Sequence, residues 1–193
     1  MNFLAHLFLS RHSDDLMIGN YLGDFVKGPI NGQYSPSITS GIRLHRQIDS
    51  FTDRHPIRIE QRKLFSKKRR RYAGVILDVA YDHFLSRNWA EFTSESRTRF
   101  IKMVYQVLDH HSENFPDRAR FFLDCMLTAD ALNRYHHLGG IENTYNLMSR
   151  RGRTHAPLIG ASSEIRENYK QIRTGFMTFF PELIDQVSVW EKP

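Results

Sequence analysis

Residues 73–87 read AGVILDVAYDHFLSR, and this stretch decides the fold class. When it is wound as a helix at about 100° per residue, apolar side chains occupy nearly every side. The polar exceptions in its interior are Asp78, Asp82 and His83. Because such a helix is stable only when other elements surround it, we predict that it is a buried central helix.

The rest of the chain carries the same helical signals. Proline follows Ser35 at position 36 and recurs at Pro56, Pro116 and Pro181, where each ring can occupy the first turn of a helix. No series of alternating strands stands out. We therefore predict an all-α fold with a single compact multi-helix domain over residues 1–193. The expected helices span residues 2–10, 14–27, 36–50, 56–71, 73–87, 95–112, 117–127, 129–138, 141–150, 162–180 and 181–190.

The composition excludes several classes of protein. The chain has 193 residues, of which 40% are hydrophobic and 12% aromatic, so it can bury a core without disulfide bridges. Its single cysteine, Cys125, lies among apolar neighbours that predict a buried, unreactive thiol. No apolar run approaches the roughly 20 residues that span a bilayer, and no cleavable leader is recognisable. We expect a soluble protein of the reducing cytoplasm.

The positive charge is concentrated in one segment. Lysine and arginine number 27 and aspartate and glutamate 21, which gives a net charge of +6. The segment 56–71 alone holds eight basic residues and one acid, and the remainder of the chain is close to neutral. Such a segment attracts an anionic partner, which could be nucleic acid, an anionic membrane or an acidic protein. A solvated helix face that maintains solubility would look the same.

A histidine and an aspartate stand one helical turn apart at His45 and Asp49. Side chains four residues apart project from the same strip of a helix. Apolar residues, which include Ile42 and Ile48, flank this pair, whereas Arg43 and Arg46 fall on the opposite side. The imidazole and the carboxylate are therefore predicted to point inward.

Asp78 and Asp82 repeat this spacing within the buried helix. Two buried carboxylates one turn apart repel each other and lose hydration, which destabilises the fold unless a cation or hydrogen-bond donors lie between them. A divalent metal is one solution, and His83 is placed to serve the edge of the same site. Caps on helices or pairing with arginine are the structural alternative.

Two further polar residues occur in apolar surroundings, His6 in the first helix and Asp24 after Leu22. Imidazole and carboxylate ligands together suit manganese, iron or zinc, and a site rich in carboxylates favours manganese or magnesium. Four separate segments that each offer an inward histidine or aspartate indicate a metal site. The chain has no Gly-x-Ser-x-Gly motif, Walker loop or dinucleotide fingerprint.

These motifs together resemble one family of enzymes. The segments are MNFLAHL (1–7), GDFVKG (23–28), GIRLHRQID (41–49), TD (52–53), LDVAYDHFLSR (77–87) and MSRR (148–151). In content and order they are similar to the bacterial acyl carrier protein phosphodiesterases. That family is considered a divergent relative of the all-α metal phosphohydrolases named for a His-Asp dipeptide, which implies a fold similar to theirs. No histidine is directly followed by aspartate in this chain.

The resemblance implies hydrolysis of holo acyl carrier protein, with release of 4′-phosphopantetheine and of the apo protein. It implies a divalent cation, typically Mn²⁺, with Mg²⁺ or Fe²⁺ as other choices. We expect the metal ligands to be His6, Asp24, His45 and Asp82. Further ligands or groups that orient the imidazoles are Asp49 and Asp78, and His83 is the candidate for proton transfer to the departing serine alkoxide.

Acyl carrier protein is small and acidic, so the basic segment is the expected docking surface. Arg46 is predicted to hold the phosphate, and the predicted carrier-binding residues are Lys67, Lys68, Arg69 and Arg70. Two other functions fit parts of the pattern: a metal phosphohydrolase of nucleotides, and a helical nucleic-acid-binding module without catalysis. The inward acids argue against the second, so nucleic acid is an improbable partner.

Overall fold

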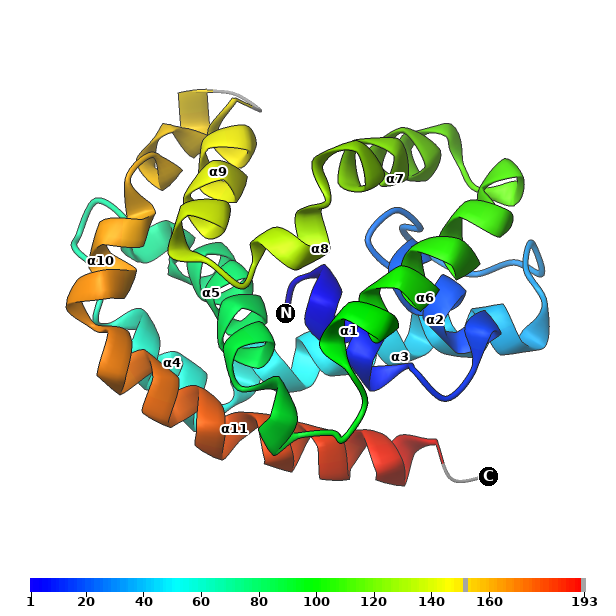
Figure 1. The fold of residues 1–193 in the computed structure, drawn as a ribbon, viewed down its shortest axis with the longest axis horizontal. Helices are drawn as coiled ribbons and strands as arrows, with labels where there is room; N and C mark the ends of the chain where they lie inside the picture. Colours follow the sequence, from blue (N-terminus) through cyan, green and yellow to red (C-terminus); the bar gives the residue numbers. More distant parts are fainter. Residues whose placement is uncertain (151–152, 192–193) are drawn as a thin grey trace.

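Helix α1 (Phe3–Leu9) lies at the centre of the molecule, and every one of its residues is buried. Figure 1 shows it enclosed by helices from all later parts of the chain. The computed structural model describes residues 1–150 and 153–191, so Arg151 of the 148–151 motif lies outside the described residues. The helix predicted over residues 2–10 is confirmed.

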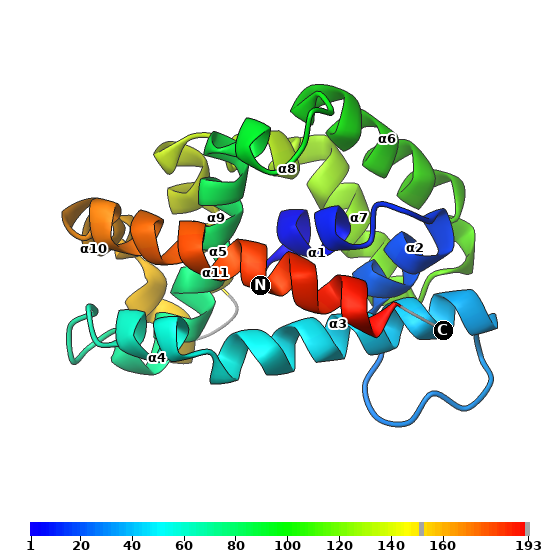
Figure 2. The ribbon, with the colours of Figure 1, turned by 90° about the horizontal axis from the view of Figure 1, so that it is seen from below.

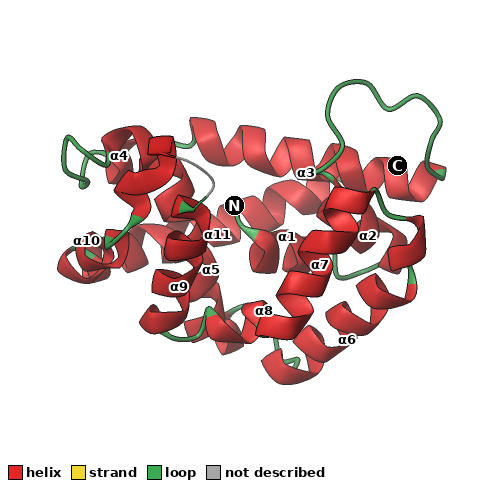
Figure 3. Cartoon of the chain, turned by 90° about the horizontal axis from the view of Figure 1, so that it is seen from above, coloured by secondary structure: helices red, strands yellow, loops and turns green. Residues whose placement is uncertain are grey.

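The described residues form an all-α structure without strands, as predicted (Figure 3). The α-helices that follow α1 are α2 (Asp14–Leu22), α3 (Pro36–Arg54), α4 (Pro56–Arg62), α5 (Ala73–Arg87), α6 (Arg97–His110), α7 (Asp117–Ala129), α8 (Ala131–Arg134), α9 (Leu138–Ser149), α10 (Ala161–Glu167) and α11 (Tyr169–Trp190). Short 3-10 helices are η1 (Arg70–Tyr72), η2 (Trp89–Glu91), η3 (Ser112–Asn114) and η4 (Arg153–Leu158).

Several boundaries differ from the prediction: α3 extends to Arg54, and the helix expected over 162–180 is divided at Asn168 between α10 and α11. A helix was expected over 56–71, but α4 ends at Arg62, and a turn-rich segment carries the basic residues to η1. Helix α2 ends at Leu22, before Gly23 and Asp24. The predicted break at Pro181 is wrong, because α11 continues through it. Apolar residues on both sides of the proline, such as Phe176 and Leu183, are buried, and this packing outweighs the lost backbone hydrogen bond.

Helix α5 is buried over most of its surface, as its sequence predicts. It lies beside α1, and α3 and α11 run side by side below them (Figure 2). Asp82 of α5 accepts hydrogen bonds from the backbone N–H groups of Leu4 and Ala5 at 2.7 and 3.1 Å. One buried carboxylate thus caps the central helix and fixes it against α5.

The prediction of a buried Cys125 is wrong, because its side chain is exposed. Helix α7 buries a narrow stripe of Ala119, Leu123 and Met126 and leaves Phe121 69% exposed. Other helices cover only one side of α7, so the apolar neighbours of the thiol do not enclose it.

Helices α2 and α3 cross at two glycines, Gly19 and Gly41. A Cβ atom on Gly41 would lie 2.8 Å from the Gly19 Cα and 2.9 Å from the Asn20 backbone nitrogen, which is too close for real Cβ atoms. We expect Gly41→Ala to push the helices apart and lower the free energy of unfolding by about 2 kcal/mol. Urea unfolding checks this value, with Gly139→Ala as the control because open space surrounds that position. Equal stability of the two variants would contradict the close crossing.

Candidate active site

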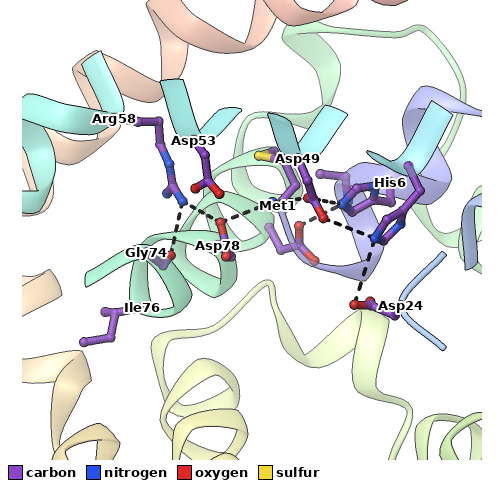
Figure 4. Close-up of polar contacts among 12 residues, drawn as sticks. Met1, His6, Asp24, Asp49, Asp53, Arg58, Gly74, Ile76 and Asp78 are labelled. Atoms are coloured by element: carbon purple, nitrogen blue, oxygen red, sulfur yellow. Dashed lines mark hydrogen bonds and ion pairs between the residues drawn. The ribbon is translucent and has the colours of Figure 1, made fainter. Parts of the chain in front are cut away.

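Helices α1 and α3 bring together His6, His45 and Asp49, the group of possible metal ligands found among the described residues. The His6 Nε2 atom lies 3.2 Å from Asp49 Oδ1, and the His45 Nε2 atom lies 3.2 Å from Asp49 Oδ2. One carboxylate therefore faces two imidazoles (Figure 4). We call these three residues the His-His-Asp cluster.

The two imidazole rings are stacked, with their centroids 4.1 Å apart and an angle of 17° between their planes. Asn20 of α2 fixes both rings from the side away from Asp49. The His45 Nδ1 atom lies 2.8 Å from the Asn20 backbone oxygen, and the His6 Nδ1 atom lies 2.8 Å from Asn20 Oδ1. Asn20 is fully buried. In the sequence it is a polar residue within the apolar run LMIGNYL (16–22), and this is the signal that could have identified it.

These contacts determine which nitrogen carries the proton in each ring. The backbone oxygen of Asn20 can only accept, so His45 donates from Nδ1. The Asn20 side-chain amide donates through Nδ2 to the His6 backbone oxygen at 3.0 Å, so its Oδ1 accepts and His6 also donates from Nδ1. In their neutral forms both imidazoles therefore direct an unprotonated Nε2 toward Asp49.

The surroundings of the cluster shift the pKa values of His6 and Asp49. Burial lowers the pKa of His6, and the neighbouring His45 lowers it further. Without a cation, hydrogen bonds from His45 and His6 to Asp49 require rings that are also protonated at Nε2; such bonds outweigh burial and hold the pKa of Asp49 well below its ordinary value. A metal ion in place of those protons would meet two imidazole Nε2 atoms and an ionised carboxylate at one point.

The spacing of these donors fits a metal ion. Two ligand atoms that each lie about 2.0–2.2 Å from one ion are themselves separated by about 3.0–3.5 Å. The observed separations between Nε2 and the carboxylate oxygens, both 3.2 Å, lie within this range. The donor set of two imidazoles and a carboxylate suits a divalent transition metal.

Asp24 lies at the open side of the cluster. Its Oδ1 atom is 3.9 Å from His45 Nε2, and 47% of its side chain is exposed. Because α2 ends at Leu22, Asp24 belongs to the following loop rather than to the Asn20 face of the helix. Three of the four predicted ligands, His6, Asp24 and His45, therefore meet here, together with Asp49.

Asp78 and Asp82, in contrast, each have their own polar partners and do not share a site. Asp78 forms an ion pair with the fully buried Arg58 at 2.6 Å and with the Met1 amino group at 3.2 Å. That amino group also lies 3.3 Å from Asp49 Oδ1, so it links Asp78 to the cluster (Figure 4). Arg58 is not among the predicted site residues, because nothing in the sequence of the basic segment distinguishes a buried arginine from the exposed ones.

Asp82 caps α1 rather than joining the cluster, and a divalent ion between Asp78 and Asp82 is not needed to satisfy either group. Burial raises the pKa of Asp82 to about 7, although the N–H groups of Leu4 and Ala5 partly offset this. The four-residue spacing of Asp78 and Asp82 predicted that both carboxylates point inward, but it could not show which partners each carboxylate has.

His83, the predicted proton donor, is held away from the cluster. Its Nδ1 atom donates to the Tyr135 backbone oxygen at 2.7 Å, and its Nε2 atom lies 3.0 Å from the Tyr169 hydroxyl. Burial lowers the pKa of His83 to about 4. The ring is therefore neutral at pH 7, and its contacts connect α5 to the α8–α9 region and α11.

His83 should make the stability of the fold pH-dependent. The unfolded chain binds a proton at this residue near pH 6.5 and the folded chain near pH 4, so stability falls as the pH decreases between these values. The full effect is about 3 kcal/mol. We expect His83→Gln, which does not titrate, to show a shallower loss of stability between pH 6.5 and 4 in urea unfolding. Parallel pH profiles for both proteins would contradict a neutral buried His83.

The basic segment divides into paired and unpaired residues. Arg58, Arg62, Lys63 and Arg69 form ion pairs with acids, and Arg69 also donates to the backbone oxygens of residues 157 and 159. The cations that are exposed and have no acidic partner among the described residues are Lys67, Lys68, Arg70 and Arg71. They lie between α4 and α5, where the chain projects from one end of the molecule (Figure 2).

The structure therefore places two predicted substrate-binding residues in structural contacts. Arg69 pairs with Glu164 of α10. Arg46 donates to the backbone oxygens of Val26 and Gly28 at 3.1 and 2.8 Å, which holds the loop between α2 and α3. The sequence shows that both arginines lie close to candidate sites along the chain, but it does not show which acceptors they contact in the fold.

Known proteins resemble this chain over nearly its whole length. The family model described as acyl carrier protein phosphodiesterase matches residues 1–183. The chain belongs to the acyl carrier protein phosphodiesterase family. The predicted family is thus confirmed, and residues of the His-His-Asp cluster lie within the matched range.

Individual members of the acyl carrier protein phosphodiesterase family agree with this assignment. A protein of that name from Photorhabdus laumondii is 35% identical over 187 residues, which cover 96% of this chain and 94% of the relative. Another, from Yersinia enterocolitica, is 37% identical with 96% and 97% coverage. A third, from Serratia proteamaculans, is 35% identical with the same coverage as the second.

No solved structure matches the chain, so the relation to the His-Asp phosphohydrolases stays a prediction. Among the helices of the described residues, none combines the length and the apolar character needed to cross a bilayer.

Proposed function

We propose that this protein hydrolyses the phosphodiester that joins 4′-phosphopantetheine to a serine of holo acyl carrier protein. Water adds to phosphorus, the bond between phosphorus and the serine oxygen breaks, and the serine oxygen gains a proton. The products are apo acyl carrier protein and 4′-phosphopantetheine. Family membership supports this reaction, and the His-His-Asp cluster is the observation that carries it.

A divalent ion, for which Mn²⁺ is our first choice, would be held by His6, His45 and Asp49, with Asp24 at its open side. When bound, it supplies a Lewis acid that polarises the phosphate and acidifies water. Asn20 keeps both imidazoles in the orientation that presents Nε2. Such supporting contacts fix ligand geometry, so we expect Asn20 to act as a positioning residue.

The acidic residues around the cluster have different roles. Asp78, which is itself paired with the buried Arg58, holds the Met1 amino group beside Asp49, and this contact favours the ionised form of the Asp49 carboxylate. Asp24, whose side chain is 47% exposed, is accessible to an incoming substrate. His83 and Asp82 take no part in proton transfer in this proposal, since both are held by structural hydrogen bonds.

Mass spectrometry of holo acyl carrier protein gives the direct test. After incubation with the protein and Mn²⁺, we expect the carrier to lose the mass of its prosthetic group, and a chelator should prevent the loss. An unchanged carrier, with hydrolysis of free nucleotides instead, would replace this function by that of a nucleotide phosphohydrolase. Salt-dependent binding of DNA or RNA with no hydrolysis would indicate the nucleic-acid-binding module.

The unpaired cations Lys67, Lys68, Arg70 and Arg71 are proposed to attract the acidic carrier protein. Reversal of all four to glutamate should lower kcat/KM for the carrier about tenfold or more at low salt and remove most of its salt dependence. Hydrolysis of a small diester, bis(p-nitrophenyl) phosphate, is the control and should not change. If the carrier reaction kept its rate and its salt dependence, this segment would not be the docking surface.

A further inference from the structure

A groove with a volume of about 550 Å³ opens beside Asp24. Its lining residues come from the start of α1, the loop after α2, α7 and α9. The residues that line it are Asn2, Phe3, Asp24, Phe25, Arg118, Phe121, Phe122 and Met148. We infer that this groove binds the pantetheine arm of the substrate, with the phosphate at the Asp24 end.

The groove is continuous with the cluster through Asp24. This residue lines the groove, and its carboxylate lies 3.9 Å from His45 Nε2. A phosphodiester at the cluster would therefore have its prosthetic arm beside the groove. The cavity on the outer face of α3, of about 540 Å³, contains no residue of the cluster and no Asp24. Its volume alone does not make it a candidate for the arm.

The lining matches the chemistry of the arm. Pantetheine carries two amides, a branched dimethyl carbon and a terminal thiol, and ligand sites of this kind are mostly apolar with a few polar groups. Phe3, Phe25 and Phe122 form one aromatic group, with centroid distances of 5.0–6.5 Å between them. These rings supply a rigid apolar wall for the dimethyl carbon and the methylene groups.

Two exposed residues on α7 have no other role in the fold. Phe121 is 69% exposed, the highest value among the exposed large hydrophobic residues of the described chain. Arg118 lies one turn earlier and has no hydrogen-bond or ion-pair partner among the described residues. Arg118 and Asp24 both line the groove, and a guanidinium can bind phosphate oxygens in bidentate fashion. In this proposal Arg118 binds the phosphate and Phe121 contacts the pantetheine arm.

The inference rests on the proposed function, and the test separates the two. We would measure 4′-phosphopantetheine binding by calorimetry with Mn²⁺ present, and hydrolysis of holo acyl carrier protein and of bis(p-nitrophenyl) phosphate. Phe121→Ala should weaken 4′-phosphopantetheine binding about tenfold and raise KM for the carrier by a similar factor. Because the small diester has no pantetheine arm, its kcat/KM should not change.

The matched control is Leu147→Ala, which removes a 60% exposed leucine next to Met148 but does not line the groove. This control should behave as the unmodified protein in all three measurements. If the unmodified protein cleaved the carrier and Phe121→Ala matched it in product binding and KM, the groove assignment would be overturned and the proposed function would stand. If the unmodified protein neither cleaved the carrier nor bound 4′-phosphopantetheine, both proposals would be overturned.

Discussion

Asp49→Asn is expected to lower kcat/KM for holo acyl carrier protein by about 10³-fold and to abolish tight Mn²⁺ binding. Asp49 supplies the carboxylate that faces both imidazoles, with one oxygen 3.2 Å from His6 Nε2 and the other 3.2 Å from His45 Nε2. The amide removes the negative charge and keeps the size of the side chain. Steady-state kinetics and calorimetric titration with Mn²⁺ check the two effects separately.

Asp185→Asn on α11 is the control for this variant, since Asp185 is exposed and lies outside the cluster. It removes the same charge from the surface and should change neither rate nor metal affinity. If Asp49→Asn bound Mn²⁺ as tightly as the control, Asp49 would not be a ligand. The cluster would then be a set of hydrogen-bonded core residues.

Asp82→Ala is expected to lower the free energy of unfolding by about 3 kcal/mol. The carboxylate accepts from the backbone N–H groups of Leu4 and Ala5, and both residues are fully buried. Alanine leaves these two donors without an acceptor at the start of the central helix. Urea unfolding monitored by circular dichroism measures the change.

Asp82→Asn separates this capping role from the metal-ligand role that the sequence suggested. The amide oxygen keeps one acceptor and removes a buried charge, whose cost is visible in the pKa of about 7. We expect Asp82→Asn to be more stable than Asp82→Ala and to bind Mn²⁺ with unchanged affinity. A large loss of Mn²⁺ affinity in Asp82→Asn at intact stability would show that Asp82 is a ligand.

The sequence predicts the fold class and the buried helices well because apolar periodicity reports burial directly. Helix α5 is apolar on nearly all sides and is buried, and α1 behaves in the same way. The predictions of a helix break at Pro181 and of a buried Cys125 are wrong for another reason. Both depend on which neighbours cover a helix, and this is a tertiary property that local sequence does not contain.

The candidate site is predicted in part. The four-residue spacing places His45 and Asp49 on one face, and both join the cluster. Asp78 and Asp82 have the same spacing but two separate sets of partners. Spacing along a helix predicts only the direction in which a side chain points, and not the group that it meets. Which group meets a carboxylate is decided by the other helices: α1 offers backbone N–H groups to Asp82, and α4 offers Arg58 to Asp78.

The measurement that tests the central claim most directly is anomalous diffraction at the manganese edge from crystals grown with Mn²⁺. We predict one strong peak about 2.0–2.3 Å from His6 Nε2, His45 Nε2 and an oxygen of Asp49. A well-ordered cluster without any peak, with both Nε2 atoms hydrogen-bonded to Asp49 as imidazolium groups, would contradict the metal site and the hydrolytic function built on it.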